Sequence, residues 1–306
     1  TLADPGAEGR AGSAVSSPSF SPPIDDMIAP MTERSEGHVV DSAATVRSRI
    51  GPADSPTISV VVPVKDDAAL LARCLRALHA QESPADEIIV VDNDSSDSSA
   101  SVARASGARV LTCIEPGIPA AASTGYDAAR GDLILRLDAD CEPDADWISA
   151  VVSAFGQDER IGAVTGGARF TDGPVALRVP LARLYLGAYT SLLSVTLGHR
   201  PLFGSNLAFR REAWHAVRAD VHRGDAHIHD DLDLAFHLGE NHRIARLPGE
   251  SMGMSMRPFT AGQFGRRVQR GFRSVLVHWP RDFPPVRWAR LVVRRRLRGP
   301  AARRTR

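Results

Sequence analysis

The sequence predicts an α/β fold with a mostly parallel sheet flanked by helices. Two runs rich in β-branched residues, TISVVVPV (57–64) and EIIVVDN (87–93), have the length and composition of buried parallel strands. Segments with helical apolar spacing alternate with such runs, as in doubly wound sheets. Aspartates follow two of the runs, in VVDND and RLDAD. Because sheets of this class bind ligands at the carboxyl ends of their strands, the same pattern also predicts where a site lies.

The remaining elements follow in order along the chain. Further strands are expected at 109–114 and 132–140, and the helices between the four strands begin near Asp66, Asp94 and Pro119. After residue 160 the pattern becomes less regular. It predicts a strand at 161–170, a helix at 175–197, a short strand or loop at 202–209, a helix at 230–238 and a strand at 242–248.

Composition excludes several classes of protein. The chain has 306 residues, of which 43% are hydrophobic and 24% charged, and a formal net charge of +1, so it is not a typical nucleic-acid binder. Its three cysteines have no metal-ligand spacing, which indicates a reducing, cytoplasmic compartment. The apolar stretch at 184–197 is shorter than the roughly 20 residues that span a bilayer. Lys65 is the only lysine, so nearly all positive charge is arginine.

Three segments differ in composition. Residues 1–56 are rich in Ala, Gly, Ser and Pro without apolar periodicity and are predicted to be disordered. Residues 57–265 form the folded domain, and 266–306 form an arginine-rich tail with 14 arginines and one acidic residue. Within this tail, 286–298 has the pattern of an amphipathic helix. This helix is expected to bind an anionic membrane surface. The alternatives, in order of preference, are a solvated tail and binding to nucleic-acid phosphates.

Asp138 and Asp140 are the first candidates for chemistry. Carboxylates two residues apart at a strand end can converge on a hard cation such as Mg²⁺ or Mn²⁺. Neither lies next to an evident arginine or lysine that would neutralise it locally. The alternative is that they only cap the turn before Pro143.

Two further acidic groups have structural alternatives as well. Asp92 can accept hydrogen bonds from a ribose or base, or it can cap the following helix. Asp230, Asp231 and Asp233 can interact with a helix dipole, or one of them can be a general base aimed at a hydroxyl. The histidines around them show no metal-ligand spacing.

Several segments together resemble family 2 glycosyltransferases with a GT-A fold. They are TISVVVPVKDD, EIIVVDNDSSD, AARGDLILRLDADCEPD, FGSNLAFRREAW and DDLDLAFHL, which occur in the family's order over about residues 57–250. The resemblance implies transfer of a sugar from a nucleotide-sugar donor to a hydroxyl acceptor with inversion, assisted by Mg²⁺ or Mn²⁺. A membrane-facing tail would suit a lipid-linked acceptor and a peripheral position at the inner face of a membrane.

The resemblance also implies roles for individual residues. On the donor side, Pro63, Val64 and Asp67 belong to the loop that touches the nucleotide base, and Asp92 contacts the nucleoside. Asp138 and Asp140 form the Asp-x-Asp motif, with Asp140 as the usual metal ligand.

On the acceptor side, Asp231 matches the general base, and Asp230 replaces a glutamate of the family motif. Gly204, Ser205 and Asn206 resemble the loop that shapes the acceptor site.

The sequence departs from the family in two places. Ala122, Ser123 and Thr124 replace an Ala-Arg-Asn loop, and ESMGMSMRP (250–258) lacks the histidine that completes the metal site in many relatives. Water is the preferred substitute there, with His278 as the other candidate. These departures keep one alternative open, a catalytically impaired relative that binds nucleotide-sugar or membrane. A nucleotidyltransferase is disfavoured because PVKDDAAL is not a glycine-rich phosphate loop.

Overall fold

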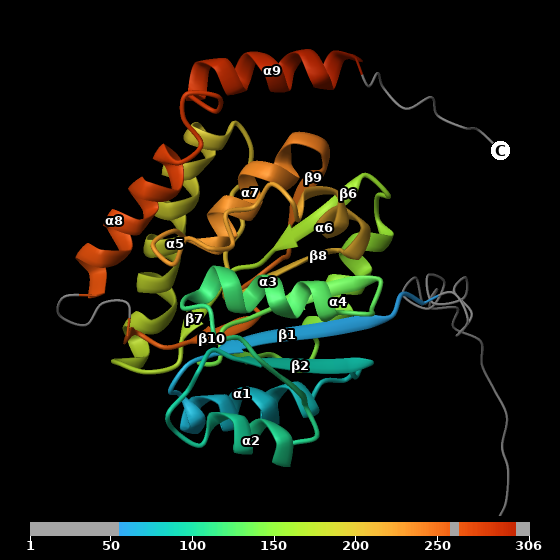
Figure 1. Ribbon diagram of the computed structural model, residues 1–306, viewed down its shortest axis with the longest axis vertical. Helices are drawn as coiled ribbons and strands as arrows, with labels where there is room; N and C mark the ends of the chain where they lie inside the picture. Colours follow the sequence, from blue (N-terminus) through green and yellow to red (C-terminus); the bar gives the residue numbers. More distant parts are fainter. Residues whose placement is uncertain (1–54, 258–262, 298–306) are drawn as a thin grey trace, which may run out of the picture. The chain divides into compact units, whose positions relative to one another are not determined.

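The computed structural model describes residues 55–257 and 263–297 (Figure 1). The disorder predicted for residues 1–56 falls outside the described residues, except for the last two positions. The end of the predicted tail, 298–306, also lies outside them.

A seven-stranded sheet forms the centre of the fold, in the order β3-β2-β1-β4-β8-β6-β9. Pairs β3–β2, β2–β1, β1–β4 and β6–β9 are parallel, whereas β8 is antiparallel to both neighbours. This confirms the predicted mostly parallel α/β fold. The strands are β1 (Ile58–Val64), β2 (Glu87–Asp92), β3 (Arg109–Thr112), β4 (Leu133–Arg136), β6 (Ile161–Thr165), β8 (Leu207–Arg210) and β9 (Arg243–Arg246).

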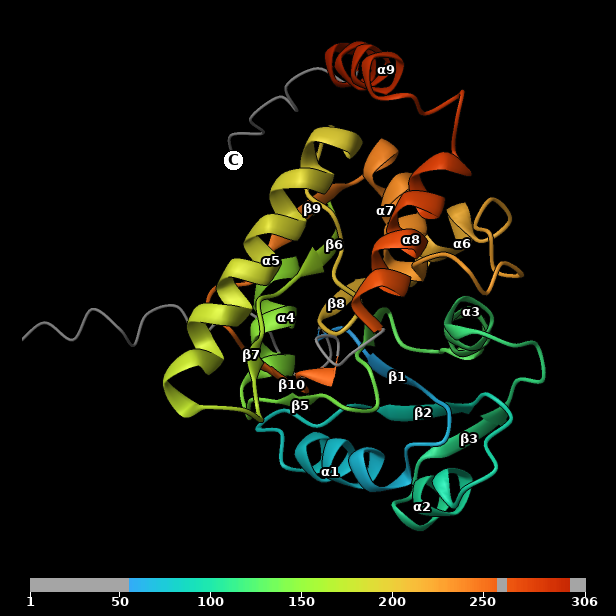
Figure 2. The same ribbon diagram turned by 90° about the vertical axis from the view of Figure 1, so that its left-hand side faces the viewer.

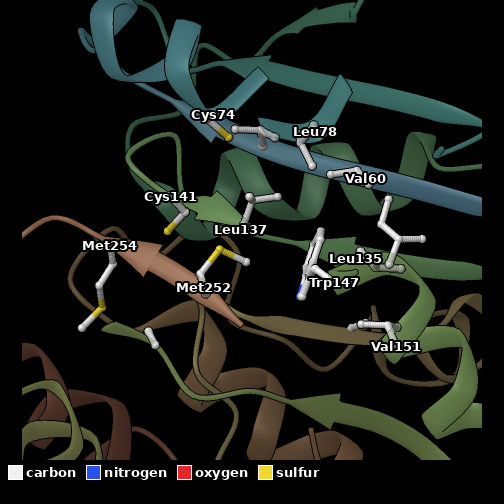
Figure 3. Packing of buried hydrophobic residues seen from close by; sticks show 14 of the residues in the cluster. Val60, Cys74, Leu78, Leu135, Leu137, Cys141, Trp147, Val151, Met252 and Met254 are labelled. Atoms are coloured by element: carbon white, nitrogen blue, oxygen red, sulfur yellow. The ribbon is translucent and has the colours of Figure 1, made fainter. Parts of the chain in front are cut away.

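Helices cover both faces of this sheet. Helices α1 (Ala68–His79), α2 (Ser99–Ala105) and α4 (Trp147–Gly156) pack on one face, and α3 (Ile118–Ala128), α6 (Arg211–Val217) and α7 (Asp230–Asn241) pack on the other. Alternate residues of each strand therefore enter different cores: Val60 and Val62 join the first, and Val61 joins the second. Trp147 is fully buried in the first core beside Leu135 and Met252 (Figure 3).

A second, three-stranded sheet was not predicted. It consists of β5 (Glu142–Pro143), β10 (Met252–Met254) and β7 (Arg169–Phe170). The predicted strand at 161–170 is divided between this sheet and the large one, and the predicted strand at 132–140 ends at Arg136. Consequently Asp138 and Asp140 lie in the turn after β4. Because β10 pairs with β5, the residues that follow β10 reach the same region.

Three helices complete the described structure: α5 (Val175–Leu197), α8 (Gln263–Leu276) and α9 (Pro284–Leu297). Figure 2 shows α5 and α8 standing beside α7. The predicted boundary at residue 265 lies inside α8, and Arg287 of α9 is fully buried against α5 and α7, where it donates to the carbonyls of Leu197 and Phe236. Within 55–257 and 263–297, none of the helices combines the length and apolar character needed to cross a bilayer.

Candidate active site

The loops after β1 and β2 form the rim of the site at the predicted edge of the sheet. Asp66 and Asp94 both have positive φ, 51° and 56°, which is uncommon for residues other than glycine. The Asp66 carboxylate accepts hydrogen bonds from the backbone N–H and hydroxyl of Ser96 at 2.6 and 2.9 Å. Lys65 donates to the carbonyls of Asn93 (2.9 Å) and Asp94 (2.7 Å). These bonds hold the two loops against each other.

A pocket of about 220 Å³ opens at this rim. Its lining contains five of the six residues that the resemblance places on the donor side, namely Pro63, Val64, Asp67, Asp138 and Asp140. The sixth residue, Asp92, is buried at the end of β2 and does not line the pocket. The next residue, Asn93, lines the pocket instead. The amide of Asn93 is fixed by bonds to the carbonyls of Cys113 and Glu115.

The carboxylates of Asp138 and Asp140 converge as expected for a cation site. Oxygens of both lie within 4.8 Å of each other and of the Cys141 sulfur. Burial, followed by the charge of Asp138, raises the pKa of Asp140. Burial would also raise the pKa of Asp138, but the charge of Arg136, the hydrogen bond from Ser205 and the charges of two further arginines together lower it. Burial raises the pKa of Cys141, which leaves a thiol, so the two carboxylates are the groups here that suit a hard cation.

Contrary to the sequence expectation, both aspartates do have cationic partners. Arg136 lies 2.9 Å from Asp138 and is almost completely buried. Arg257 bridges Asp67 at 2.5 Å and Asp140 at 2.9 Å. Arg257 thus contacts Asp140 from the segment that lacks the family histidine. His278 lies elsewhere in the fold, beside Asp233.

Arg136 also connects Asp138 of the Asp-x-Asp motif to helix α7. Its guanidinium lies 3.5 Å from Asp230 as well as next to Asp138. The pKa of Asp230 is raised to about 6, mainly by burial. The charge of Arg136 lowers this pKa, and the charge of the neighbouring Asp231 raises it. The first turn of α7 thus carries a carboxyl that titrates close to neutral pH.

Asp231 is held by the loop that precedes β8. One carboxylate oxygen accepts a hydrogen bond from the backbone N–H of Gly204 at 2.7 Å, and the Tyr189 hydroxyl lies 3.5 Å from the same oxygen. The next residue, Ser205, donates to Asp138 at 2.6 Å. Two adjacent residues of this loop therefore join the proposed base to the Asp-x-Asp motif.

The other members of this loop have packing roles. A Cβ at Gly204 would lie 1.9 Å from Arg136, so the loop can approach that side chain only with glycine. Asn206 is fully buried, where it donates to Gly167 and accepts from the indole of Trp147, both at 2.9 Å. Its side chain thus fixes the loop from behind.

An apolar groove of about 510 Å³ reaches Asp231 from the other side. Its walls are apolar side chains of α5 and α8, including Leu192, Leu193, Phe272, Val275 and Leu276. Arg267 lines both this groove and the pocket at the rim, so the two cavities meet at that residue.

Three cationic residues of the site were not predicted from the sequence: Arg136, Arg257 and Arg267. A fourth, Lys65, lies within the predicted base-contacting loop 63–67, but its own role was not predicted. One of the three had a local signal. Arg136 lies two residues before Asp138, and residues two apart in an extended chain project to the same side. Arg257 and Arg267 are more than 100 residues from the motif in sequence, and only the second sheet and α8 bring them to it.

Comparison with known sequences identifies relatives of the chain. The profile of the family described as Glycosyl transferase family 2 matches residues 59–217, just over half of the chain. The glycosyltransferase AglE of Haloferax volcanii is 31% identical over 124 residues, which cover 38% of this chain and 40% of that protein. An undecaprenyl-phosphate 4-deoxy-4-formamido-L-arabinose transferase of Pseudomonas aeruginosa is 34% identical over 110 residues, covering 33% and 32%. The matches thus span well under half of these relatives' length.

Solved structures show the same fold. A mannosyltransferase of Pyrobaculum calidifontis, solved with GDP-Man and Mn²⁺, superposes with a TM-score of 0.56 at 22% identity and covers 78% of this chain and 70% of its own. Glucosyl-3-phosphoglycerate synthase of Mycobacterium tuberculosis, solved with Mn²⁺, UDP and phosphoglyceric acid, gives 0.52 at 22% identity and covers 72% and 78%. These likenesses and the sheet order confirm the GT-A fold. With the profile match over half of its length, the chain belongs to glycosyl transferase family 2.

Proposed function

We propose that the protein is a metal-dependent, inverting glycosyltransferase that moves a sugar from a nucleotide-sugar to a hydroxyl of an acceptor with a large apolar part. The observation that carries this proposal is the position of Asp231. Its carboxylate lines the apolar groove and is joined through Gly204 and Ser205 to Asp138 of the donor pocket.

The donor pocket has the groups that a nucleoside diphosphate requires. Lys65, Arg257 and Arg267 supply positive charge around it, and Asp138 and Asp140 are the residues that would hold Mg²⁺ or Mn²⁺. The cation would neutralise the charge that develops on the leaving diphosphate. Two solved neighbours of the same fold contain Mn²⁺ with a nucleotide or nucleotide-sugar, which supports this choice of cofactor.

Asp231 acts as the general base in this proposal. Its carboxylate accepts the proton of the acceptor hydroxyl as that oxygen attacks the anomeric carbon, and the bond to the diphosphate breaks on the opposite face of the sugar. The backbone N–H of Gly204 and the Tyr189 hydroxyl orient the carboxylate. Arg136 compensates the charges of Asp138 and Asp230, so that both carboxylates can lie close to Asp231.

The groove favours an acceptor with a hydrocarbon chain. Its lining is predominantly apolar, and large side chains of α5 and α8 remain exposed beside it, with 69% of Leu192 and 66% of Phe272 accessible. One relative acts on undecaprenyl phosphate by its name, which agrees with a lipid-linked acceptor. Exposed arginines on α8 and α9 would place the groove at an anionic membrane surface, peripherally and at the cytoplasmic face.

The test is transfer by the full chain with Mn²⁺, a panel of nucleotide-sugars and a hydroxyl acceptor that carries an alkyl chain. Asp231→Asn should reduce the rate of transfer by about 10² to 10⁴, because it removes the proton acceptor and keeps the shape. Donor binding, measured by calorimetry, should remain within about threefold of the wild type.

Asp127→Asn is the matched control, because Asp127 is an aspartate on α3 that pairs with Arg223 and lines neither cavity. It should retain full transfer. A wild-type protein that binds donor and Mn²⁺ but transfers no sugar would instead favour the non-catalytic alternative, and equal rates for Asp231→Asn and wild type would exclude this base.

A further inference from the structure

A second cluster of ligand-type side chains lies outside the site described above. His222, Asp233, His237 and His278 each present one nitrogen or oxygen, and these four atoms all lie within 4.8 Å of one another. They come from the loop after α6, from two positions one turn apart on α7, and from the segment after α8. Sequence spacing does not predict this cluster, since its members are spread over 57 positions of the chain (222 to 278).

The four atoms lie close enough together to share one ion. Oδ1 of Asp233 lies 2.7 Å from Nδ1 of His222, 3.0 Å from Nε2 of His278 and 3.7 Å from Nε2 of His237. Only the first contact is an aligned hydrogen bond, and the buried Nε2 atoms of His237 and His278 have no hydrogen-bond partner among the described residues. Ligands of a tetrahedral ion with bonds of 2.0–2.1 Å lie about 3.3 Å apart, which is within this range.

We propose that these four side chains bind one transition-metal ion, with Zn²⁺ the ion that suits them best. Three imidazoles and one carboxylate are typical ligands of Zn²⁺, and four protein ligands complete a tetrahedral structural site. Mg²⁺ and Mn²⁺ prefer oxygen ligands, which Asp138 and Asp140 offer in the proposed donor site. The two metal sites are therefore distinguished by their chemistry.

The surroundings of the cluster fit a bound ion. The second oxygen of Asp233 accepts the backbone N–H of His222 at 2.8 Å, which leaves Oδ1 directed at the three rings. The His278 ring stacks on Phe236 with centroids 4.0 Å apart, which fixes its plane. A pocket of about 310 Å³ lined by His222, His237 and His278 provides a path from solvent.

The ion would fasten α8 to α7. Asp233 and His237 belong to the helix that begins with Asp230 and Asp231, while His278 follows the helix that forms one wall of the groove. A bound ion would therefore stabilise the relative position of the proposed base and the acceptor groove. It takes no part in the transfer itself, and the site does not depend on the proposed function.

The experiment uses the full chain after chelation and dialysis, with metal content measured by mass spectrometry after Zn²⁺ is added. About one ion should remain bound per chain, both in the wild type and in the double variant Asp138→Asn/Asp140→Asn, which lacks the donor-site carboxylates. His237→Ala and His278→Ala should each bind at least about 100-fold more weakly. His215→Ala removes an exposed histidine of α6 and should bind like the wild type.

Co²⁺ provides a readout that does not depend on the folding of any variant. Added to the metal-free wild type, it should give the intense visible absorption of a tetrahedral site, and Zn²⁺ should abolish that absorption. Zn²⁺ should also raise the melting temperature of the metal-free protein, whereas Mg²⁺ at equal concentration should not. Absence of Zn²⁺ binding in the wild type, or binding that is lost in the double variant and kept in His237→Ala, would overturn the proposal.

Discussion

Single residues set the electrostatics of the active site. Asp138, Asp140, Asp230 and Asp231 lie in or beside two adjoining cavities, and Arg136 is the cation that touches both pairs, at Asp138 and at Asp230. Because a buried charge without a partner costs several kcal/mol, the charges of Asp138 and Asp230 depend on that guanidinium.

The pKa of Asp230 predicts a pH dependence of stability. Its folded-state pKa, about 6, is above the usual 3.8, so the folded chain binds this proton more tightly than the unfolded chain. The resulting stabilisation is complete below about pH 4 and is lost as the pH rises through about 6. Urea unfolding at pH 4 and pH 7 should show that Asp230→Asn removes a pH-dependent contribution on the order of 2 kcal/mol. Equal pH dependence in variant and wild type would contradict the shift.

The position of Arg257 predicts how its removal changes the affinity for Mn²⁺. Its guanidinium bridges Asp67 and Asp140, where it competes with a cation for the same carboxylate oxygens. Arg257→Gln should bind Mn²⁺ about tenfold more tightly than the wild type in calorimetry without nucleotide, because a charge-assisted contact no longer has to break. Affinity for the nucleoside diphosphate should fall, since one cation of the pocket is lost. Arg246→Gln is the control outside this pocket and should change neither.

At the scale of elements, α5 and α8 define the groove. Leu192 of α5 is exposed and lines it, whereas Leu177 of the same helix is similarly exposed and does not. Leu192→Asp should raise KM for an alkyl-chain acceptor about tenfold or more, because an apolar contact is replaced by a charge. Leu177→Asp should leave KM unchanged, and both variants should treat a short water-soluble acceptor like the wild type. Identical KM values in all three proteins would show that the chain binds elsewhere.

The elements also show what a sequence can and cannot predict. Buried strands such as Ile58–Val64 and helices with one apolar face, such as Ala68–His79, are determined by local pattern, and they were predicted to within a few residues. The second sheet has strands of two or three residues, which leave no periodic signal. Contacts made by that sheet and by α8, including those of Arg257, therefore could not be predicted from spacing.

At the scale of the whole molecule, the arginine-rich end has two kinds of arginine. Arg287 is fully buried and pairs with Asp282 at 2.7 Å, whereas Arg296 is exposed. Arg287→Met should lower the free energy of unfolding by about 1 to 3 kcal/mol, because the buried carbonyls of Leu197 and Phe236 lose their donor, while Arg290 still pairs with Asp282. Arg296→Met should change it by less than about 0.5 kcal/mol.

The same two arginines separate folding from membrane binding. Arg296→Glu should weaken binding to anionic vesicles by about 2 kcal/mol at low salt, since two units of charge change near the surface. The measurement is sedimentation with vesicles at two salt concentrations. Unchanged sedimentation would place this surface of α9 away from the membrane. A truncation that removes α9 would not give this answer, because it also removes the buried Arg287.

The loops after β1 and β2, which form the rim of the donor pocket, have a practical consequence for chemical labelling. Lys65 is the only lysine of the chain, and this exposed residue lines the pocket at that rim. A reagent that acylates primary amines can therefore modify only this side chain and the amino terminus. Its rate of reaction at Lys65 becomes a direct readout of whether the pocket is filled. A nucleoside diphosphate should protect this amine and leave the terminal one reactive, so that peptide mass spectrometry can rank donor nucleotides before any acceptor is known.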